Sequence, residues 1–527
     1  MGDDQDAVFA FLADPATHGL STPVERIDTN AAAVFLAGPD VYKVKRAVRF
    51  PFMDLSTLEK RHAACEAEIT VNRPYAPDLY LGTVPISRGA DGALRFGGNE
   101  PIEWAVHLKR FDETRTLDRV AGRDGLSPAI LGDLAWAVVD SHARAEKRDG
   151  VVATDDLGSV VAETVSSLIE RREVFEPAKA KALAEAMRSA FAALRPLLLD
   201  RGAEGFVRRC HGDLHLRNIA MIDDKPVLFD AIEFDESIAT IDILYDFAFL
   251  LMDLWERDLR REANVVLNRY LWRSATLPDD LRGLAALPLF LALRAAVRAK
   301  VEALRFATVG HDRNAGLDAH RYFDFAQAFL EPAQTRLIAV GGYSGTGKTS
   351  LSRSVASHVG RAPGAVHLRS DIERKRLMGA GELDRLPPSG YEPEVTEKVF
   401  AALRDQAEMA LTAGHSVIVD AVHKTPDERR LIAAVAERLG VPFTGLWLTA
   451  PVEVLIGRIA HRRADASDAT AAVVMLQADQ PSGEIDWTTL DTTRPIRDNT
   501  AAALRAARLP PEPVNTPRQA GSAASRE

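Results

Sequence analysis

The stretch GGYSGTGKTS, Gly341 to Ser350, decides the fold of the second part of this 527-residue chain. An apolar run, Arg336 to Val340, precedes it, and a segment with helical spacing follows it. A buried strand that runs through a glycine-rich loop into a helix is typical of α/β proteins. Three further apolar runs, AVHLRS, HSVIVDA and FTGLWLTA, alternate with helical stretches. The sequence therefore predicts a parallel sheet covered by helices.

The same stretch satisfies the pattern G-x-x-x-x-G-K-[ST], and its context is the strand, loop and helix that this pattern requires. Backbone N–H groups of such a loop wrap phosphates, and the helix N-terminus faces the anion. Lys348 supplies a positive charge, and the Thr349 hydroxyl can ligate Mg²⁺. We predict a site for ATP and Mg²⁺ made of Gly342, Ser344, Gly345, Thr346, Gly347, Lys348, Thr349 and Ser350.

Three side chains beyond this loop are candidates for chemistry. Asp371 follows a strand and Arg374 comes three residues later, so that on a helix both face one direction. The carboxylate can take a proton from an acceptor hydroxyl while the arginine holds the acceptor or a phosphate. The alternative is a helix cap beside a solvated arginine. Asp420 ends a buried strand, where it can hold the metal, and the next residue is Ala421 rather than the glutamate of motor ATPases. This favours transfer to a substrate over hydrolysis.

Arginines at helical spacing follow the last strand, at positions 458, 462 and 463. Arg458 and Arg462 can neutralise the charge that develops on a transferring phosphoryl group, and a solvated basic helix face is the alternative. From about residue 336 to 463 the chain resembles the small-molecule P-loop kinases of the gluconate kinase, shikimate kinase and zeta-toxin type.

A second stretch, CHGDLHLRNI from Cys210 to Ile219, carries a different pattern. Asp213 is followed five residues later by Asn218, the arrangement of kinase catalytic loops, in which the acid orients or deprotonates the acceptor hydroxyl and the amide oxygen ligates Mg²⁺. Asp230 lies twelve residues further on, at the end of an apolar strand, where a second metal ligand is expected. These residues resemble the aminoglycoside phosphotransferase family and its kinase-like fold over residues 25 to 330.

The resemblance extends upstream to an ion pair. Lys43 is the candidate for the nucleotide phosphates, with Lys45 as a competitor, and Glu68 is the candidate partner, with Glu66 as the alternative. His211 and His215 are expected to brace the loop rather than bind metal. One feature departs from the family: the first strands, IDTNAAAVFLAG, lack a glycine-rich phosphate loop.

The order of elements predicts two domains. Strands with one helix fill the first 110 residues, and mainly helical segments follow, so we expect a bilobal protein-kinase-like α+β domain over residues 1–330. An α/β P-loop NTPase domain is expected over residues 331–507. A tail over residues 508–527, rich in Pro, Gly, Ser and Ala without an apolar face, is predicted to be disordered.

Composition limits the partners. The net charge of -10 argues against nucleic-acid binding, and the two cysteines fit a reducing compartment. The acidic amino terminus and the short apolar runs indicate a cytoplasmic protein without a membrane partner. The oligomeric state is left open.

These patterns together predict a bifunctional phosphotransferase that moves the γ-phosphoryl group of ATP to hydroxyl groups of small molecules, such as sugars or aminoglycoside-like metabolites. The alternative is an ATP-sensing regulatory protein in which one or both kinase modules are inactive. Phosphorylation of proteins has little support, because no activation segment is recognisable after Asp230.

Overall fold

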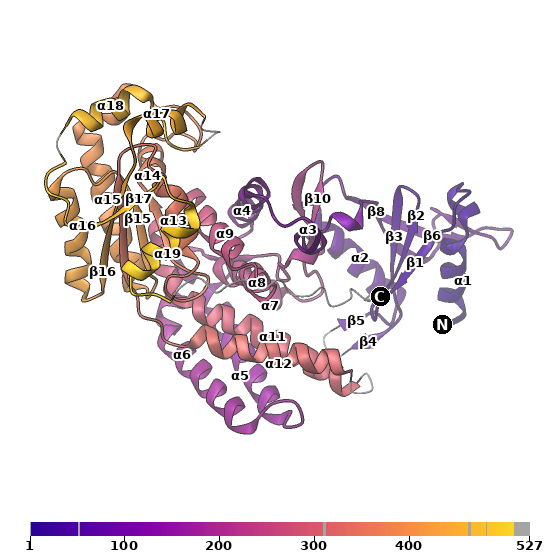
Figure 1. The fold of residues 1–527 in the computed structure, drawn as a ribbon. Coiled ribbons are helices and arrows are strands. Elements are labelled where there is room, and N and C mark those ends of the chain that lie inside the picture. Colours follow the sequence, from indigo (N-terminus) through magenta and orange to yellow (C-terminus); the bar gives the residue numbers. More distant parts are fainter. Residues whose placement is uncertain (1, 51–52, 309–311, 462–464, 481, 511–527) are drawn as a thin grey trace. The chain divides into compact units, whose positions relative to one another are not determined.

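A computed structural model describes residues 2–50, 53–308, 312–461, 465–480 and 482–510 of the chain (Figure 1). The chain forms two compact units. The first comprises Met1–Ala275 and Ala286–Glu331, and the second comprises Thr276–Ala285 and Pro332–Glu527. Both predicted fold classes are confirmed: a kinase-like unit comes first, and a unit with a parallel sheet follows.

The first lobe of the first unit is an antiparallel sheet with the strand order β1-β2-β3-β8-β6-β7. Its strands are β1 (Glu25–Asp28), β2 (Ala32–Ala37), β3 (Asp40–Lys45), β6 (Tyr80–Arg88), β7 (Leu94–Phe96) and β8 (Pro101–Lys109). The short strands β4 (Arg49–Phe50) and β5 (Met53–Asp54) pair with each other apart from this sheet.

One helix covers each face of this sheet. Helix α1 (Gly2–Ala13) buries Val8 and Leu12 in one apolar cluster with Val44 of β3. Helix α2 (Leu58–Asn72) packs in another cluster, on β6 and β8. Because successive side chains of a strand point to opposite faces, the neighbours of Val44, which are Lys43 and Lys45, lie on the α2 side.

The second lobe is mainly helical. Its helices are α3 (Leu117–Arg123), α4 (Pro128–Arg144), α5 (Gly150–Glu170), α6 (Pro177–Glu204), α7 (Glu236–Ala239), α8 (Ile243–Glu256), α9 (Arg260–Arg273), α11 (Leu287–Thr308) and α12 (Arg313–Leu330). Two short antiparallel pairs interrupt them: β9 (Val207–Arg209) with β12 (Thr240–Asp242), and β10 (Ile219–Ile222) with β11 (Lys225–Leu228). Helix α8 is buried along nearly its whole length, which explains its apolar sequence.

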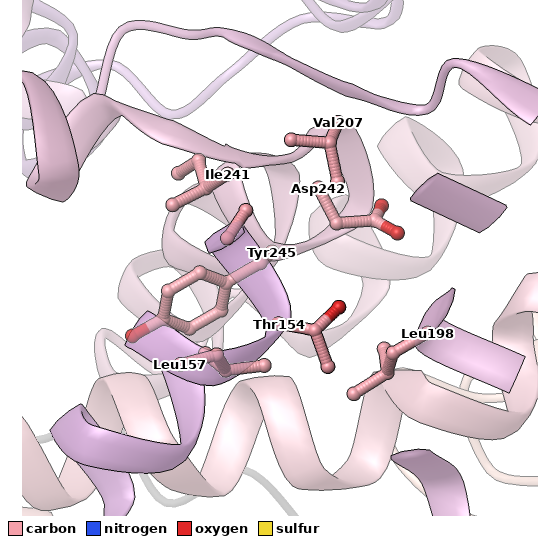
Figure 2. Close-up of a pocket in the computed structure, with 8 residues that line it drawn as sticks. Thr154, Leu157, Leu198, Val207, Ile241, Asp242 and Tyr245 are labelled. Carbon is pink, nitrogen blue, oxygen red and sulfur yellow. The ribbon is translucent and has the colours of Figure 1, made fainter. Parts of the chain in front are cut away.

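A small cavity lies among α5, α6, α8 and the β9–β12 pair, and Figure 2 shows the residues around it. Its volume of about 20 Å³ is room for roughly one water molecule. Asp242 on its wall is paired with Arg201 at 2.7 Å. This cavity is therefore a packing feature and is too small for a nucleotide.

The second unit contains a parallel sheet of five strands with the order β14-β15-β13-β16-β17. The strands are β13 (Leu337–Gly342), β14 (Val366–Arg369), β15 (Val417–Asp420), β16 (Phe443–Thr449) and β17 (Thr488–Asp491). Helices α13 (Lys348–Ala356) and α19 (Ile496–Ala506) share one apolar core with β13 and β16. The other helices of this part are α14 (Ser370–Leu377), α15 (Pro393–Thr412), α16 (Pro426–Leu439), α17 (Val452–Ala460) and α18 (Ala471–Asp479).

The second unit also takes Thr276–Ala285, which the predicted division at residue 330 assigned to the first domain. The reason is packing: helix α10 (Leu277–Gly283) lies on α15, and His415 Nε2 is 3.0 Å from the Leu284 carbonyl oxygen. The predicted disordered tail lies outside the described residues from position 511 onward. Of its first residues, Leu509 packs against the core of the second unit. Among the described residues, no helix is long and apolar enough to cross a membrane.

Candidate functional site

The loop between β9 and β10 holds Asp213 and Asn218 together. The Asn218 amide nitrogen donates to Asp213 Oδ2 at 3.0 Å and to the Asp213 carbonyl oxygen at 3.0 Å. The Asp213 side chain is 37% exposed, so an acceptor can reach it. Burial raises the pKa of Asp213, but the hydrogen bond with His215 and the nearby positive charges outweigh burial and hold the pKa below its usual range. Asp213 is therefore an ionised acceptor of hydrogen bonds at neutral pH.

Both histidines of the loop make hydrogen bonds within the site. His215 Nε2 lies 3.3 Å from Asp213 Oδ2. His211 Nε2 lies 2.9 Å from the Phe229 carbonyl oxygen, and the His211 carbonyl accepts the Ile232 N–H at 3.0 Å. His211 thus ties the Asp213 loop to the segment that carries Asp230.

Two acids of α8, which sequence reasoning missed, anchor the loop backbone. Asp246 accepts the Gly212 N–H at 2.8 Å and the His211 N–H at 3.4 Å, and His142 Nε2 lies 3.1 Å from it. Asp253 accepts the Leu216 N–H at 3.0 Å. Their spacing of seven residues places both on one face of the helix. The signal was two acids inside the apolar run ILYDFAFLLMDLW, because buried acids require partners.

The β10–β11 hairpin returns the chain to Asn218, whose carbonyl accepts the Phe229 N–H at 3.0 Å. Asp230 therefore follows directly beside the loop. It has a φ of 59°, the left-handed region, and its N–H donates to the Tyr80 hydroxyl at 3.1 Å. Asn72 of α2 exchanges two hydrogen bonds with Ala231, at 2.7 and 3.2 Å. These bonds fix a conformation that an aspartate rarely adopts without support.

Glu68 of α2 contacts both candidate lysines of β3. Lys43 Nζ is 2.9 Å from Glu68 Oε1, and Lys45 Nζ is 2.6 Å from Glu68 Oε2. Lys43 also reaches Asp230 Oδ1 at 3.2 Å. Glu66 instead contacts the Thr83 hydroxyl, and its side chain is 53% exposed. The structure thus brings Lys43, Glu68 and Asp230 together.

The charges at this ion pair stabilise one another. Burial lowers the pKa of Lys43, but the carboxylates of Asp230 and Glu68 raise it well above its usual value. Burial raises the pKa of Glu68, but the two lysines lower it to about 2. Lys43 and Glu68 are therefore both charged at neutral pH.

The turn between β1 and β2 consists of Thr29, Asn30 and Ala31, without glycine. The Thr29 hydroxyl accepts the Ala32 N–H at 2.9 Å, so side-chain bonding closes the turn. No glycine lies in this turn, and Lys43 is the cation that contacts Asp230 in this lobe.

In the second unit, the loop after β13 needs its glycines. Gly342, Gly345 and Gly347 have φ values of 129°, 83° and 87°. A Cβ at Gly342 would lie 2.5 Å from the Leu448 carbonyl oxygen, and one at Gly345 would lie 2.9 Å from that of Leu455. Such contacts exclude any other residue. Lys348 Nζ donates to the Gly342 carbonyl at 3.0 Å, so the loop folds around its own lysine.

Thr349 and Asp420 meet at the carboxyl end of the sheet. The Thr349 hydroxyl donates to Asp420 Oδ2 at 2.6 Å, and His367 Nε2 lies 3.3 Å from the same oxygen. Burial raises the pKa of Asp420, but His367, Arg369 and Lys348 lower it below its usual range. A hydroxyl beside an ionised carboxylate supplies the oxygen donors that Mg²⁺ prefers.

A cavity of about 520 Å³ opens at this edge of the sheet. The predicted residues on its wall are Ser344, Gly345, Gly347, Lys348, Thr349, Ser350, Asp371, Asp420 and Arg458. The other two predicted loop residues, Gly342 and Thr346, are not among the residues on the cavity wall. The Thr346 hydroxyl donates to the Tyr343 carbonyl at 2.7 Å and so stabilises the loop. Burial raises the pKa of Asp371, and Asp420 adds to this, although Arg369 and Lys348 oppose it.

The predicted arginines are placed differently from one another. Arg458 lines the cavity and donates to the Thr492 hydroxyl at 3.0 Å. Arg374 is not among the described residues on the cavity wall. Burial lowers the pKa of Arg374, and the nearby carboxylate of Asp371 opposes this, so the two side chains are close enough to interact. Its buried guanidinium donates to the Gly390 carbonyl at 2.7 Å and to the Thr396 hydroxyl at 3.1 Å, so it supports the fold of this region. Arg462 and Arg463 lie outside the described residues.

Each of the two units contains a segment that matches a known protein family. Residues 60–287 match the phosphotransferase enzyme family, and residues 337–481 match a family described as an AAA domain. An adenylyl-sulfate kinase of Myxococcus xanthus is 27% identical over 122 residues, which are 23% of this chain and 62% of that protein. A choline/ethanolamine kinase family protein from Mesorhizobium loti is 16% identical in sequence, and the match covers 63% of this chain and 95% of that one, with a TM-score of 0.36.

Relatives that match nearly the whole chain are uncharacterized proteins of Mycobacterium tuberculosis and Mycobacterium bovis. They are 30% identical over 480 residues, which are 89% of this chain and 92% of theirs. The predicted resemblance to two kinase families is therefore confirmed. In this chain, a domain of the phosphotransferase enzyme family is followed by a P-loop kinase domain. The chain belongs to the same family as these mycobacterial proteins.

Proposed function

We propose that the chain is a bifunctional ATP-dependent phosphotransferase and that each unit transfers the γ-phosphoryl group to a hydroxyl of a small molecule. The observation that carries this proposal is that each unit has its own lysine beside a carboxylate, together with oxygen atoms of the kind that Mg²⁺ prefers. In the first unit Lys43 lies 3.2 Å from Asp230, and in the second Thr349 lies 2.6 Å from Asp420.

In the first unit, Asp213 orients the acceptor hydroxyl. As the acceptor oxygen bonds to the γ-phosphorus, the bond to the bridging oxygen of ADP breaks, and the hydroxyl proton passes to Asp213. The low pKa of Asp213 makes it a weak base, so proton transfer belongs late in the step. Asn218 and Asp230 offer amide and carboxylate oxygens for Mg²⁺, which neutralises phosphate charge when bound.

In the second unit, the loop N–H groups and Lys348 would hold the phosphates, and Thr349 and Asp420 would hold Mg²⁺. Asp371, with its raised pKa, is the better general base of the two units. It takes the proton of the acceptor hydroxyl as the new oxygen–phosphorus bond forms. Arg458 on the cavity wall balances the charge of the transferring group.

The acceptors that fit this chemistry are sugars, aminoglycosides and related hydroxylated metabolites. We further propose that the two units phosphorylate the same metabolite one after the other, which would explain why they are joined in one chain. If the two sites instead act on unrelated acceptors, this shared-substrate idea fails while phosphotransfer itself stands.

The test uses the full-length protein with labelled ATP, Mg²⁺ and a panel of sugars, aminoglycosides, nucleosides and adenylyl sulfate. Asp213→Asn removes the first activity, Lys348→Ala removes the second, and the double variant is the blank. Label that moves to a panel member in wild type and not in the blank supports the proposal. Tight ATP binding without transfer to any acceptor refutes it and favours a sensor.

A further inference from the structure

The kinase-like unit carries a second buried ion pair beside the Lys43–Glu68 pair. Lys45 Nζ is 2.5 Å from Glu233 Oε1, and the two side chains are only 5% and 9% exposed. Taking both charges out of water is costly unless the pair is closely matched. The buried Lys45–Glu233 pair lies beside Lys43, the lysine proposed to bind phosphate, so we asked what the pair contributes to the site.

Charge balance supplies the reason. Lys43 and Lys45 lie two residues apart on β3, and both contact the single carboxylate of Glu68. Without another acid, two ammonium groups would compete for Glu68. Glu233 gives Lys45 a carboxylate of its own, just as Asp230 contacts Lys43.

The two lysines differ in access to solvent. The side chain of Lys43 is 20% exposed and that of Asp230 is 49% exposed, whereas Lys45 and Glu233 are enclosed. If Asp230 held a metal ion, Lys43 would keep Glu68 as its carboxylate partner and could face phosphate, whereas Lys45 contacts both Glu68 and Glu233. We therefore expect Lys45 to stay in its ion pairs and Lys43 to be the lysine that interacts with phosphate.

The segment before Glu233 is held by hydrogen bonds to both lobes of the first unit. Residues 229–232 are hydrogen bonded in turn to the loop residues Asn218 and His211, to Tyr80 and to Asn72. Glu233 follows this segment and joins it to β3, three residues after Asp230. Its contact with Lys45 thus sets the distance between the lysine strand and the metal-binding acid.

We propose that Glu233 is a positioning residue, which neutralises Lys45 so that Glu68 orients Lys43 toward the phosphates of ATP. This inference rests on the phosphotransfer proposed above for the first unit. Glu233 itself need not touch the nucleotide.

The experiment is a double-mutant cycle in the full chain, with Lys348→Ala present throughout to silence the P-loop site. Glu233→Gln, Lys45→Met and their combination are compared for MgATP binding by calorimetry and for ADP formation with the mixed acceptor panel. Glu66→Gln is the control, because it removes an exposed carboxylate of the same lobe.

We expect Glu233→Gln to lower turnover about tenfold when Lys45 is present and less than about twofold when Lys45 is Met, since the two changes act through one contact. The dissociation constant of MgATP should change less than about threefold, because no phosphate ligand is lost. Glu233→Asp, which keeps the charge, should retain most of the turnover and replaces Glu233→Gln if that variant does not fold.

If Glu233→Gln lowers turnover equally with Lys45 and with Lys45→Met, or does not lower it at all, Glu233 is not a positioning residue. Phosphotransfer by the first unit would still stand. Absence of MgATP binding in the Lys348→Ala protein overturns the proposed function of the first unit, and this inference with it.

Discussion

Asp246→Asn is the most informative single change in the first unit, because Asp246 is buried and holds the backbone of the loop that carries Asp213. It receives close hydrogen bonds from Gly212 at 2.8 Å and His142 at 3.1 Å. Loss of the charge weakens each by about 1 kcal/mol, and the new amide donor facing a donor costs about 2 kcal/mol. We therefore expect the free energy of unfolding of this unit to fall by about 4 kcal/mol.

The assay is urea unfolding followed by circular dichroism, together with phosphotransfer by the first unit. Turnover should fall about 100-fold, because a loop displaced by about 1 Å loses reactive alignment. Asp133→Asn, an exposed acid of α4, is the matched control and should change stability by less than about 0.5 kcal/mol. A loss with Asp246→Asn no larger than this control would refute the anchoring role.

The pH dependence gives a second check on the same residue. His142 and other positive groups hold the pKa of Asp246 below its usual value despite burial, which opposes them. A carboxyl with a depressed folded pKa contributes stability above its unfolded pKa of about 3.9 and loses it as pH falls through the folded value. The difference between wild type and Asp246→Asn should therefore shrink below about pH 4.

Three other outcomes are expected. Glu68→Gln should lower turnover of the first unit by about 30-fold or more, because Lys43 loses its orienting carboxylate, while Glu66→Gln changes it less than about twofold; equal losses would contradict the placement. Lys348→Ala should reduce MgATP binding from two molecules per chain to one in calorimetry, and an unchanged stoichiometry would count against two sites. Burial lowers the pKa of His415 to about 4, so the second unit should lose about 3 kcal/mol of stability as pH falls from about 6.5 to 4, and His415→Gln should flatten that loss in thermal unfolding.

The sequence predicted those parts of the fold and site that rest on local pattern. The strand, loop and helix around Gly342 are encoded in adjacent residues, and so is the spacing of Asp213 and Asn218. Local sequence pattern does not predict which segments that are far apart in the chain come into contact. The contact of two lysines with one carboxylate and the contact of Asp246 with Gly212 depend on packing between such segments. The bond from Arg374 to the Gly390 carbonyl does so too, and helical spacing could not predict it.

The chain passes between its two units three times rather than once, because Thr276–Ala285 leaves the first unit and returns to it. A truncated protein that begins at residue 332 would lack α10 and leave the His415 ring without the Leu284 carbonyl. A fragment ending at residue 331 would carry α10 without α15, the helix on which it packs. Exchange of the rear kinase between relatives must therefore move two separate stretches of polypeptide, and a single protease cut near residue 331 would not free either half.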